Sequence, residues 1–485
     1  MEELNELMQQ RREKLRKIID KKINPYPYRF ERTHLSKQIL DDFENLEGKE
    51  TKIAGRIISF RSHGKSTFFH ILDGEGKIQV YVKEDEVGRE NYEFLDLLDL
   101  GDFVGIEGKP FKTKTGEITV KAKSLVLLSK SLHTLPEKWH GLQDKELRYR
   151  QRYVDLFVNP QVKEVFIKRT MLITALRRYL DGLGFIEVET PILQPIYGGA
   201  LARPFKTHHH SLDMDLYLRI ADELYLKRLI VGGFEKVYEF CKDFRNEGMD
   251  KSHNPEFSML ELYQAYVDYN DVMDLCQDMI SQVAQDVLGT KKITYQGNEI
   301  DLTPPWKRVS YLDSFKEYAG IDIQGKDENQ IRQIVKELNL DTNLEQNREK
   351  LLDVIFGSQV QNKLFSPTFV VDYPIEISPL AKHHREKKGL TERFEIFIGT
   401  CEIGNAFSEL NDPLDQRQRF EQQTKLAKAG DEEAFVLDED FIRALEYGMP
   451  PTGGLGIGID RLVMILTDSP SIRDVILFPQ MRPER

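Results

Sequence analysis

The chain contains little cysteine and no long apolar run. Only three cysteines occur among its 485 residues, at the widely spaced positions Cys241, Cys276 and Cys401. This spacing argues against a disulfide framework or a cysteine zinc site, and it fits a reducing cytoplasm. The sequence has no stretch of about 18 apolar residues that could span a membrane. Its N-terminus, MEELNELMQQRR, lacks the apolar region of a secretory signal, so we expect a cytoplasmic protein without a membrane partner.

An excess of basic residues is also missing. The formal net charge is −12 at pH 7, with 68 Lys and Arg against 80 Asp and Glu. This balance argues against a dominant basic surface, so an RNA-binding region must concentrate positive charge locally. Residues 106–130, with six lysines and two glutamates, are one such region. The 40% hydrophobic and 31% charged residues are typical of a globular protein, whose length suffices for roughly two or three domains.

The first 23 residues predict an amphipathic helix. Its apolar face would consist of Leu4, Leu7, Met8, Leu15, Ile18 and Ile19. Its basic face would carry Arg11, Arg12, Lys14, Arg16 and Lys17. We expect the apolar face to pack on the following domain, while the basic face is either solvated or also contacts RNA.

Short alternating strands characterise residues 50–130. Apolar and polar residues alternate over 78–83 and again over 118–122, and glycine-containing turns occur at 73–76 and 115–116. About five short strands within this length suit a small closed barrel, of which the OB-fold is one example. Aromatic and arginine side chains on the outside of such a barrel would provide stacking surfaces for single-stranded bases.

The most informative stretch is residues 239–266. Two alternating runs flank a polar loop, which predicts an antiparallel hairpin. Arg245 and Glu247 would share one face of a strand, because side chains alternate. The same alternation places four residues of the second run on one face, namely Phe257, Met259, Glu261 and Tyr263. Carboxylates on a half-buried face need partners, so this face suits a zwitterion or a nucleotide better than a core. A solvated surface hairpin is the alternative.

Carboxylates gather again in residues 393–409. Glu395 and Glu402 fall on expected neighbouring strands and could hold Mg²⁺, which prefers carboxylate and phosphate oxygens. Asn405, Phe407 and Glu409 alternate, so they would share one face. An acid at the end of such a slot suits a lysine side chain, whose stem would pack on the aromatic ring.

Residues 447–461, YGMPPTGGLGIGIDR, are rich in glycine. Glycine allows a backbone to approach a ligand closely, and Gly199 in an earlier Gly-Gly pair has the same property. The pattern is neither the GxGxxG of a dinucleotide-binding unit nor a P-loop. By itself it therefore predicts no particular ligand.

Together these stretches resemble the motifs of class II aminoacyl-tRNA synthetases. Residues 165–191, a helix and a strand ending in Thr-Pro, resemble motif 1. Residues 239–266, with FRNE followed by HNPEF, resemble motif 2, and residues 452–466, with GGLGIGIDR, resemble motif 3. The segments HNPEFSMLELYQAY, HGLQD and RDVILFPQMRP are similar to the lysyl enzymes of bacterial type, within the aspartyl, asparaginyl and lysyl subgroup.

This resemblance implies a multidomain α+β fold. Residues 1–140 would form an N-terminal helix and an OB-fold anticodon-binding domain. Residues 141–485 would form a class II catalytic domain with an antiparallel sheet flanked by helices. The lysyl family activates L-lysine with ATP and Mg²⁺ to lysyl-adenylate and pyrophosphate, and then transfers lysine to the 3′ end of tRNA(Lys). Its members are homodimers with motif 1 in the interface.

Roles for individual residues follow from the resemblance by matched position. ATP binding would fall to Arg245, Glu247, His253, Asn254, Phe257, Glu395, Glu402 and Arg461. Among these, the catalytic residues would be Arg245, Glu247 and Arg461, and the Mg²⁺ ligands Glu395 and Glu402. Lysine would be bound by Gly199, Glu223, Arg245, Glu261, Tyr263, Asn405, Phe407 and Glu409. Anticodon bases would be contacted by Arg61, Phe68, Gln79 and Glu117.

Three other functions remain to be weighed at this point. An aspartyl- or asparaginyl-tRNA synthetase would share the motifs, but an aspartate pocket needs a cation, whereas residues 402–409 offer acids and an amide. A catalytically silent RNA-binding paralogue would not need to retain the residues Arg245, Glu247, Glu409 and Arg461. A truncated paralogue that lysylates a protein would lack the N-terminal barrel.

Overall fold

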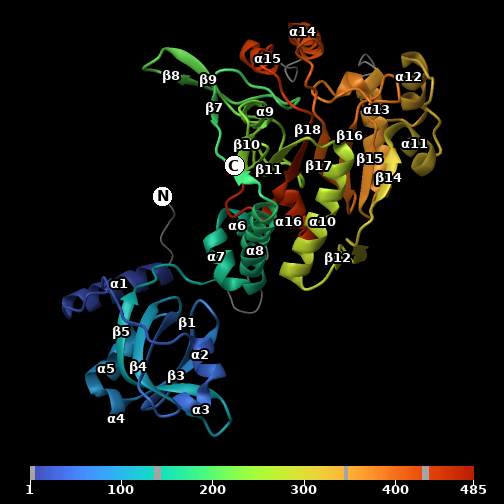
Figure 1. Cartoon of the computed structure of the whole chain (residues 1–485). Coiled ribbons are helices and arrows are strands. Elements are labelled where there is room, and N and C mark those ends of the chain that lie inside the picture. The colour runs from blue at the N-terminus through green and yellow to red at the C-terminus, as the bar shows by residue number, and fades with distance from the viewer. Residues whose placement is uncertain (1–5, 136–141, 143, 343–347, 429–435, 485) are drawn as a thin grey trace. The chain divides into compact units, whose positions relative to one another are not determined.

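The computed structural model describes residues 6–135, 142, 144–342, 348–428 and 436–484 (Figure 1). The chain divides into one unit of residues 1–141 and a second of residues 142–485. Each unit has its own hydrophobic core. Within the described ranges, no helix has both the length and the apolar character that crossing a membrane requires.

The first unit is a closed barrel with the strand order β1-β2-β3-β5-β4. Its strands are β1 (Thr51–His63), β2 (Ser66–Leu72), β3 (Lys77–Lys83), β4 (Phe103–Lys112) and β5 (Ile118–Ser129). The helical segments around it are α1 (Glu6–Asp20), α2 (Ser36–Asp41), α3 (Phe43–Leu46), α4 (Glu84–Val87), α5 (Arg89–Glu93) and η1 (Phe94–Leu97). Alternate apolar side chains such as Ile53, Val80 and Val120 fill the interior. The predicted small barrel is therefore confirmed.

The first helix differs from its predicted amphipathic pattern. Leu7 and Ile19, expected on the buried face, are each 54% exposed, although Ile18 is buried. Arg11, expected on the basic face, is buried and donates hydrogen bonds to the carbonyl oxygens of Leu100, Ser131 and His133. A guanidinium has five N–H donors and can satisfy several chain carbonyls at once, which a periodicity count does not register.

The second unit is built on a sheet with the strand order β14-β15-β16-β17-β18-β11-β10-β6. The strands are β6 (Ile186–Glu187), β10 (Lys236–Phe244), β11 (Glu256–Ala265), β14 (Lys307–Ser310), β15 (Thr368–Val371), β16 (Arg393–Ile398), β17 (Cys401–Ser408) and β18 (Thr452–Gly458). All central pairs are antiparallel, and only the outer pairs β14 with β15 and β10 with β6 are parallel. The predicted antiparallel sheet is confirmed.

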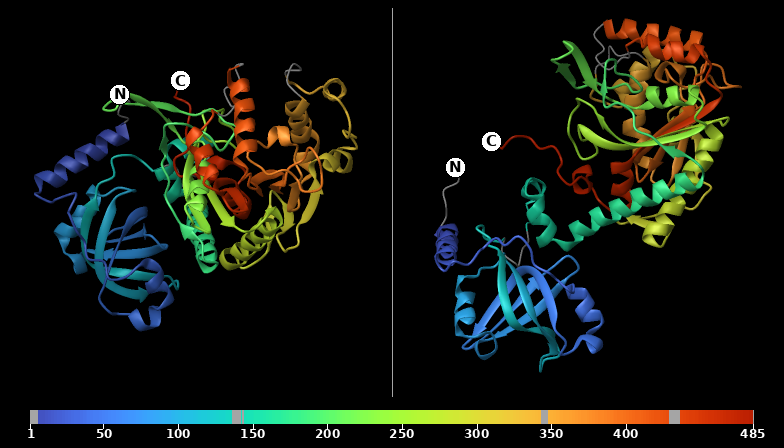
Figure 2. Two further views of the ribbon diagram at one scale, coloured as in Figure 1. Left: turned by 45° about the horizontal axis from the view of Figure 1, so that its top comes forward. Right: turned by 60° about the vertical axis from the view of Figure 1, so that its left-hand side comes forward.

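Helices cover both faces of this sheet. On one face, apolar residues of four helices share a core with the strands: α8 (Pro160–Gly182), α10 (Tyr269–Leu288), α16 (Ile459–Leu466) and α17 (Ile472–Val475). Within this layer α8 packs beside α10 (Figure 2). On the other face a smaller core joins α9 (Glu223–Val231), α14 (Pro413–Lys428) and α15 (Glu439–Glu446) to the strands. This second face contains the functional cavity described below.

The remaining elements are short and peripheral. Two small sheets are formed by β7 (Leu193–Gln194), β8 (Lys206–His209) and β9 (Met214–Leu218), and by β12 (Lys292–Tyr295) and β13 (Asn298–Asp301). The segment after α10 adds α11 (Tyr311–Ser314), α12 (Glu328–Glu337) and α13 (Arg348–Ile355) around a separate apolar cluster. Two short helices, α6 (Lys145–Arg150) and α7 (Arg152–Val158), precede α8.

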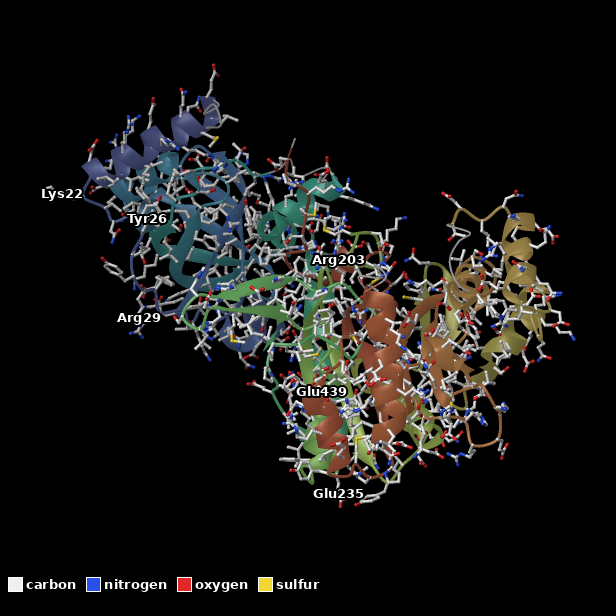
Figure 3. The ribbon with its side chains drawn as sticks, turned by 90° about the horizontal axis from the view of Figure 1, so that it is seen from above. Lys22, Tyr26, Arg29, Arg203, Glu235 and Glu439 are labelled. Atoms are coloured by element: carbon white, nitrogen blue, oxygen red, sulfur yellow. The ribbon has the colours of Figure 1, made fainter. Side chains whose placement is uncertain are left out.

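The prediction that Arg245 and Glu247 lie on a strand is wrong. Strand β10 ends at Phe244, and the chain then leaves the sheet. The amide of Arg245 donates to the carbonyl of Pro255, which has no N–H to return the bond. The amide of the next residue donates instead to the carbonyl of Arg203, which is labelled in Figure 3. Arg245 and Glu247 therefore belong to a loop at the end of the hairpin.

Candidate active site

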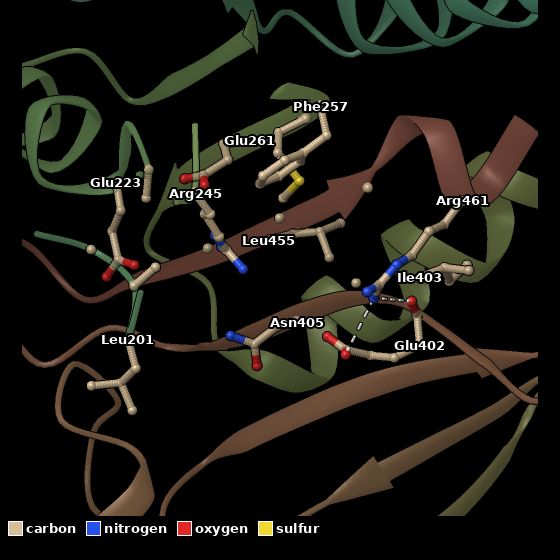
Figure 4. Close-up of a pocket in the computed structure, with 18 of the residues that line it drawn as sticks. Leu201, Glu223, Arg245, Phe257, Glu261, Glu402, Ile403, Asn405, Leu455 and Arg461 are labelled. Atoms are coloured by element: carbon tan, nitrogen blue, oxygen red, sulfur yellow. Dashed lines mark hydrogen bonds and ion pairs between the residues drawn. The ribbon is translucent and has the colours of Figure 1, made fainter. Parts of the chain in front are cut away.

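A cavity of about 380 Å³ opens on the α9 face of the sheet in the second unit. Its floor is formed by the neighbouring strands β11, β18 and β17. Its walls come from residues 199–201, from the 245–255 loop and from the first turns of α9 and α16. Glu223 and Glu261 lie toward one end and Arg461 at the other, where it is paired with Glu402, and Arg245 points into the space between the two ends (Figure 4).

A glycine of β18 keeps the floor open. Gly454 lies opposite Tyr263 of β11 and Phe407 of β17. Directly opposed residues of antiparallel strands project from the same face, so both rings flank a position without a side chain. A Cβ atom at Gly454 would lie 2.0 Å from Oε1 of Glu409 and 2.5 Å from the ring of Tyr263. The glycine-rich stretch thus contributes a strand floor rather than a phosphate-binding loop.

Buried carboxylates line the end of the cavity next to α9. These are Glu223, Glu261 and Glu409. The hydroxyl group of Tyr263 donates to Oε2 of Glu261 at 3.1 Å. Burial, and next the charge of Asp243, raise the pKa of Glu261 to about 8. Burial also raises the pKa of Glu409 well above its usual range. Acids whose ionisation is this unfavourable fit a cationic ligand, which would restore their charge.

The slot expected beside Glu409 is present. Asn405, Phe407 and Glu409 all line the cavity, so the structure brings them together. Oδ1 of Asn405 accepts a hydrogen bond from Nε of Arg393 at 2.9 Å, which fixes the orientation of the amide. Gly199 approaches from the opposite wall with a φ of +90°, a conformation that favours glycine.

Arg245 combines burial with an unused donor. Its guanidinium lies 5.1 Å from the ring centre of Phe257, a cation–π contact that holds the side chain over β11. Nε of Arg245 is buried, and no acceptor from the described residues reaches it. A buried donor without a partner costs free energy, so this atom is suited to an anionic ligand. Glu247, two residues further on, is exposed at the rim of the cavity.

A chain of hydrogen bonds fixes Arg461 at the other end. Nη2 of Arg461 lies 3.0 Å from Nε2 of His253, whose Nδ1 lies 2.8 Å from the carboxylate of Asp250. A carboxylate accepts only, so we assign the His253 proton to Nδ1, and Nε2 accepts from Arg461. Nη1 of Arg461 donates to the carbonyl of Glu402 at 2.8 Å. The guanidinium is thereby held at the cavity wall.

The residues expected to hold adenine are partly engaged with the backbone. Nδ2 of Asn254 donates to the carbonyl of Glu256 at 2.6 Å, and its Oδ1 accepts from the amide of Gln480 at 3.3 Å. Phe257 presents its ring to the same end of the cavity (Figure 4). Asn254 therefore has one N–H left for a ligand, beside an aromatic surface.

The two expected metal ligands differ in position. Glu402 lines the cavity, whereas Glu395 lies behind it and accepts hydrogen bonds from the hydroxyl of Tyr373 at 2.8 Å and from Arg393 at 2.6 Å. Burial, and next the charge of Glu402, raise the pKa of Glu395 to about 7. Two carboxylates that repel each other in this way fit a divalent cation, which would neutralise both.

Sequence reasoning missed several groups of the site. Lys227 of α9 is fully buried and pairs with both Glu223 and Glu409. Asp222 is fully buried beside Glu261, and burial followed by the charge of Glu261 raises its pKa well above the usual range. The i,i+4 spacing of Glu223 and Lys227 on a helix was the available signal, but it is also the pattern of an ordinary solvated pair.

A second hollow lies on the barrel of the first unit. The four expected anticodon residues, Arg61, Phe68, Gln79 and Glu117, all line it. The ring of Phe68 lies against that of Tyr81 in a tilted arrangement, with 4.6 Å between ring centres, and the ring centre of Tyr81 lies 6.0 Å from that of Phe111. A row of rings on an open face is suited to stacking with bases.

Glu117 is fixed at this hollow by a hydrogen-bonded chain. The amide of His70 donates to Oγ of Ser59, whose hydroxyl contacts Nδ1 of the same histidine at 2.7 Å. We therefore assign the hydroxyl proton toward Nδ1 and the ring proton to Nε2, which contacts Oε1 of Glu117 at 2.9 Å. Oε2 of Glu117 accepts from Gln79 at 2.9 Å. Sequence reasoning missed His70, which lacks a motif of its own.

The chain is similar to known proteins over its whole length. The family model described as tRNA synthetases class II (D, K and N) matches residues 144–482, and that described as OB-fold nucleic acid binding domain matches residues 51–128. A protein of Thermoanaerobacter pseudethanolicus named lysine–tRNA ligase is 59% identical, over 100% of this chain and 97% of the relative. Relatives of the same name are 60% identical in Pelotomaculum thermopropionicum (99% and 96% covered) and 56% identical in Clostridium acetobutylicum (99% and 94% covered).

Proposed function

This chain belongs to the class II tRNA synthetases (D, K and N), and on that premise we propose how its cavity activates lysine with ATP. The chain is an ATP-dependent ligase that joins lysine to tRNA, in line with its full-length relatives. The observation that carries the proposed site is the arrangement of charge in the cavity, with the buried acids Glu223, Glu261 and Glu409 at one end, the Arg461–Glu402 pair at the other and Arg245 between them.

Arg245 is the proposed centre of the activation step. The carboxylate of lysine attacks the α-phosphorus of ATP, and pyrophosphate leaves. Negative charge then accumulates on the phosphoryl oxygens, where a positioned guanidinium stabilises it. The unpaired buried Nε of Arg245 supports this role. Because the attacking carboxylate is already ionised, the step requires no general base from the chain.

The half of the cavity around Arg461 is the proposed ATP site. His253 and Arg461 would hold the γ-phosphate, since Arg461 is fixed at the wall by Glu402 and by His253 itself. Asn254 and Phe257 would contact adenine through the remaining amide proton and the ring face. Mg²⁺, when bound, neutralises the leaving pyrophosphate. Glu402 and Glu395 would hold this ion, with Tyr373 orienting the carboxylate of Glu395, and Glu247 would complete the site at the rim.

The half of the cavity next to α9 is the proposed lysine site. Its buried acids would hold the ammonium groups: Glu223 and Glu261 the α-ammonium, and Glu409, with the hydroxyl of Tyr263, the ε-ammonium. The stem would then lie along Asn405 and Phe407, with Gly199 against the backbone of the amino acid. A buried Glu409 left opposite an anionic side chain would cost several kcal/mol, which disfavours aspartate.

The barrel is the proposed reader of tRNA(Lys). Phe68 would stack on an anticodon base, while Gln79 and Glu117 would meet the edge of a base with a donor and an acceptor, and Arg61 would contact the same strand. The hydrogen-bonded chain from Ser59 to Glu117 supports base reading, because it presents fixed lone pairs. We propose that the chain acts in the cytoplasm, where tRNA is aminoacylated for translation.

A homodimer is part of the proposal. The motif 1 region, with the helices before it, exposes a concentration of large apolar side chains, namely Tyr153, Ile167, Met171, Leu183, Ile186, Ile192 and Leu193. Apolar surface of this kind is typical of protein–protein interfaces. Sedimentation of the purified chain tests it: we expect twice the mass of one chain, and a monomer at micromolar concentration would contradict the proposal.

The decisive experiment for the site is amino-acid-dependent exchange of pyrophosphate into ATP. Lysine, aspartate, asparagine and ornithine are compared side by side, without tRNA. We expect strong exchange with lysine and little with the others. Exchange with aspartate or asparagine would overturn the assignment of Glu409 to a cationic side chain. Absence of exchange with every amino acid would favour a silent RNA-binding protein instead.

A further inference from the structure

A lysine of the chain itself lies among the acids of the cavity. Lys227 is fully buried on α9. Its Nζ lies 2.5 Å from Oε1 of Glu223 and forms an ion pair with Oε2 of Glu409. It also lies 5.2 Å from the ring centre of Phe407. One ammonium group thus connects both ends of the proposed lysine site.

Lys227 leaves part of each carboxylate for a ligand. It contacts one oxygen of Glu223 and one of Glu409, and both glutamates line the cavity. Oε1 of Glu409 is buried, and no donor from the described residues reaches it. This oxygen occupies the space that the missing side chain of Gly454 leaves, since a Cβ atom there would lie only 2.0 Å away. Glycine at this position therefore makes room for the carboxylate of Glu409 in the cavity lining.

An ordinary stabilising ion pair does not explain this arrangement. A solvated i,i+4 pair contributes little, and a fully buried pair often contributes less than an apolar replacement of the same size. Burial opposes the charge of Lys227, yet the fields of Glu223 and Glu409 more than offset it and raise the pKa of the ammonium. When both carboxylates are ionised, they and the ammonium of Lys227 carry a single net negative charge, which matches the single net positive charge of free lysine.

We propose that Lys227 is a positioning residue that determines amino-acid specificity by holding Glu223 and Glu409 at a fixed separation. The remaining oxygens then receive the α-ammonium and the ε-ammonium of lysine at the distance that its side chain spans. Glu409 and Glu223 act as the ligands, and Lys227 acts through them. The inference rests on the proposed assignment of lysine to this cavity.

Two consequences follow from this role. Ornithine, one methylene shorter than lysine, cannot reach both fixed oxygens, and one methylene is worth about 10- to 200-fold in a well-formed pocket. Lys227 also favours the ionised forms of both acids, against the burial that raises the pKa values of Glu223 and Glu409. Without Lys227 these pKa values rise further, so a binding lysine has to displace a proton. Lysine binding should then improve more steeply as the pH rises than it does in the wild type.

The test compares Lys227→Met and Lys227→Arg with Arg228→Met in the full chain. Arg228 is the matched control, because it is the next residue of α9 but pairs with Asp438 and Asp440 instead. The measurement is pyrophosphate exchange, with KM determined separately for lysine, ornithine and ATP between pH 7 and 9. Circular dichroism verifies that each variant is folded.

We expect Lys227→Met to raise the KM for lysine about a hundredfold, with the KM for ATP within about twofold of the wild type. The lysine KM of this variant should fall more steeply with rising pH than that of the wild type, because Lys227 no longer offsets the raised pKa values of Glu223 and Glu409. Lys227→Arg keeps the charge but changes the spacing, so its preference for lysine over ornithine should drop about tenfold. Arg228→Met should match the wild type in all of these values.

Several results would overturn the inference. An unchanged lysine KM and an unchanged preference over ornithine in Lys227→Met would do so. An equal loss for lysine and ATP, without pH dependence, would assign Lys227 a structural role only. If Lys227→Met does not fold, an unaltered lysine-to-ornithine ratio in Lys227→Arg decides against it. Failure of the wild type to exchange with lysine would instead refute the proposed site itself, so the two failures are distinguishable.

Discussion

The cavity of the second unit and the hollow on the barrel use similar groups under opposite conditions of solvation. Each holds a glutamate fixed by a basic side chain and lies beside an aromatic ring and an amide. In the cavity, the side chains of Lys227 and Glu409 are 0% and 1% exposed. In the hollow, those of His70 and Glu117 are 26% and 47% exposed.

This difference in burial governs what each site can do with its charges. In the buried site, an unpaired carboxylate is costly, so charge matching decides which ligand enters. In the exposed site, water and salt screen the pair, so stacking and hydrogen-bond geometry carry more of the recognition. We therefore expect substitutions in the cavity to act on catalysis by orders of magnitude and those on the barrel to act on tRNA affinity by small factors.

The largest effect is expected for Arg245→Ala. It removes the half-buried guanidinium that is proposed to meet the reacting carboxylate and phosphate, and loss of such a group costs about 10²- to 10³-fold in rate. We expect kcat for lysine-dependent pyrophosphate exchange to fall by about this factor. Arg417→Ala, which removes an exposed partner of Glu439 (Figure 3), is the control and should leave exchange unchanged. A near-normal kcat for Arg245→Ala would contradict the expectation that substitutions in the cavity have larger effects than those on the barrel.

The next largest effect is expected for Glu409→Gln. The amide keeps the shape of the side chain but removes the charge proposed to face the ε-ammonium of lysine. We expect the KM for lysine to rise about a hundredfold, while the KM for ATP stays within about twofold. Separate titrations of both substrates in the exchange assay measure this. An unchanged KM for lysine would show that Glu409 does not meet the substrate.

Much of the fold and most of the cavity could be predicted from local patterns. Alternation along β11 places Glu261 and Tyr263 on one face because strand geometry repeats every second residue. The same rule placed Asn405 and Phe407 together and identified the barrel strands. These predictions succeeded because they depend on residues that are near one another in the chain.

Contacts between distant segments could not be predicted in this way. In the sequence, Glu223 and Lys227 have the spacing of a solvated helical pair. In the structure, Glu409 from a distant part of the chain also pairs with Lys227, and all three side chains are buried. Arg245 leaves its strand because Pro255, on the other side of the hairpin loop, cannot return a hydrogen bond. In each case tertiary structure changes a local pattern, and in both cases the result lies in the cavity.

A smaller effect is expected from pH on the requirement for Mg²⁺. The pKa of Glu395 is raised to about 7, first by burial and then by Glu402, so this carboxyl is largely protonated below pH 7. Mg²⁺ must displace that proton, and its apparent affinity should fall about tenfold per pH unit below 7 and level off above it. Exchange measured against Mg²⁺ concentration from pH 6 to 8.5 tests this.

Glu402→Gln sharpens the same experiment. Removing the charge of Glu402 should lower the pKa of Glu395 toward its usual range, because this charge is the largest cause of the rise after burial. The pH dependence of the Mg²⁺ requirement should therefore flatten, although the ion binds more weakly at every pH. A profile that keeps its shape in this variant would show that the two carboxylates do not share an ion.

The smallest effect is expected on the barrel, for His70→Ala. The substitution removes the ring that donates to Oε1 of Glu117 and leaves Gln79 as the remaining partner of that carboxylate. An exposed hydrogen bond of this kind is worth about 1 kcal/mol, so the KM for tRNA(Lys) should rise about fivefold in aminoacylation. Pyrophosphate exchange without tRNA should be unaffected. A loss for His70→Ala as large as that for Glu409→Gln would mean that burial does not separate the sites.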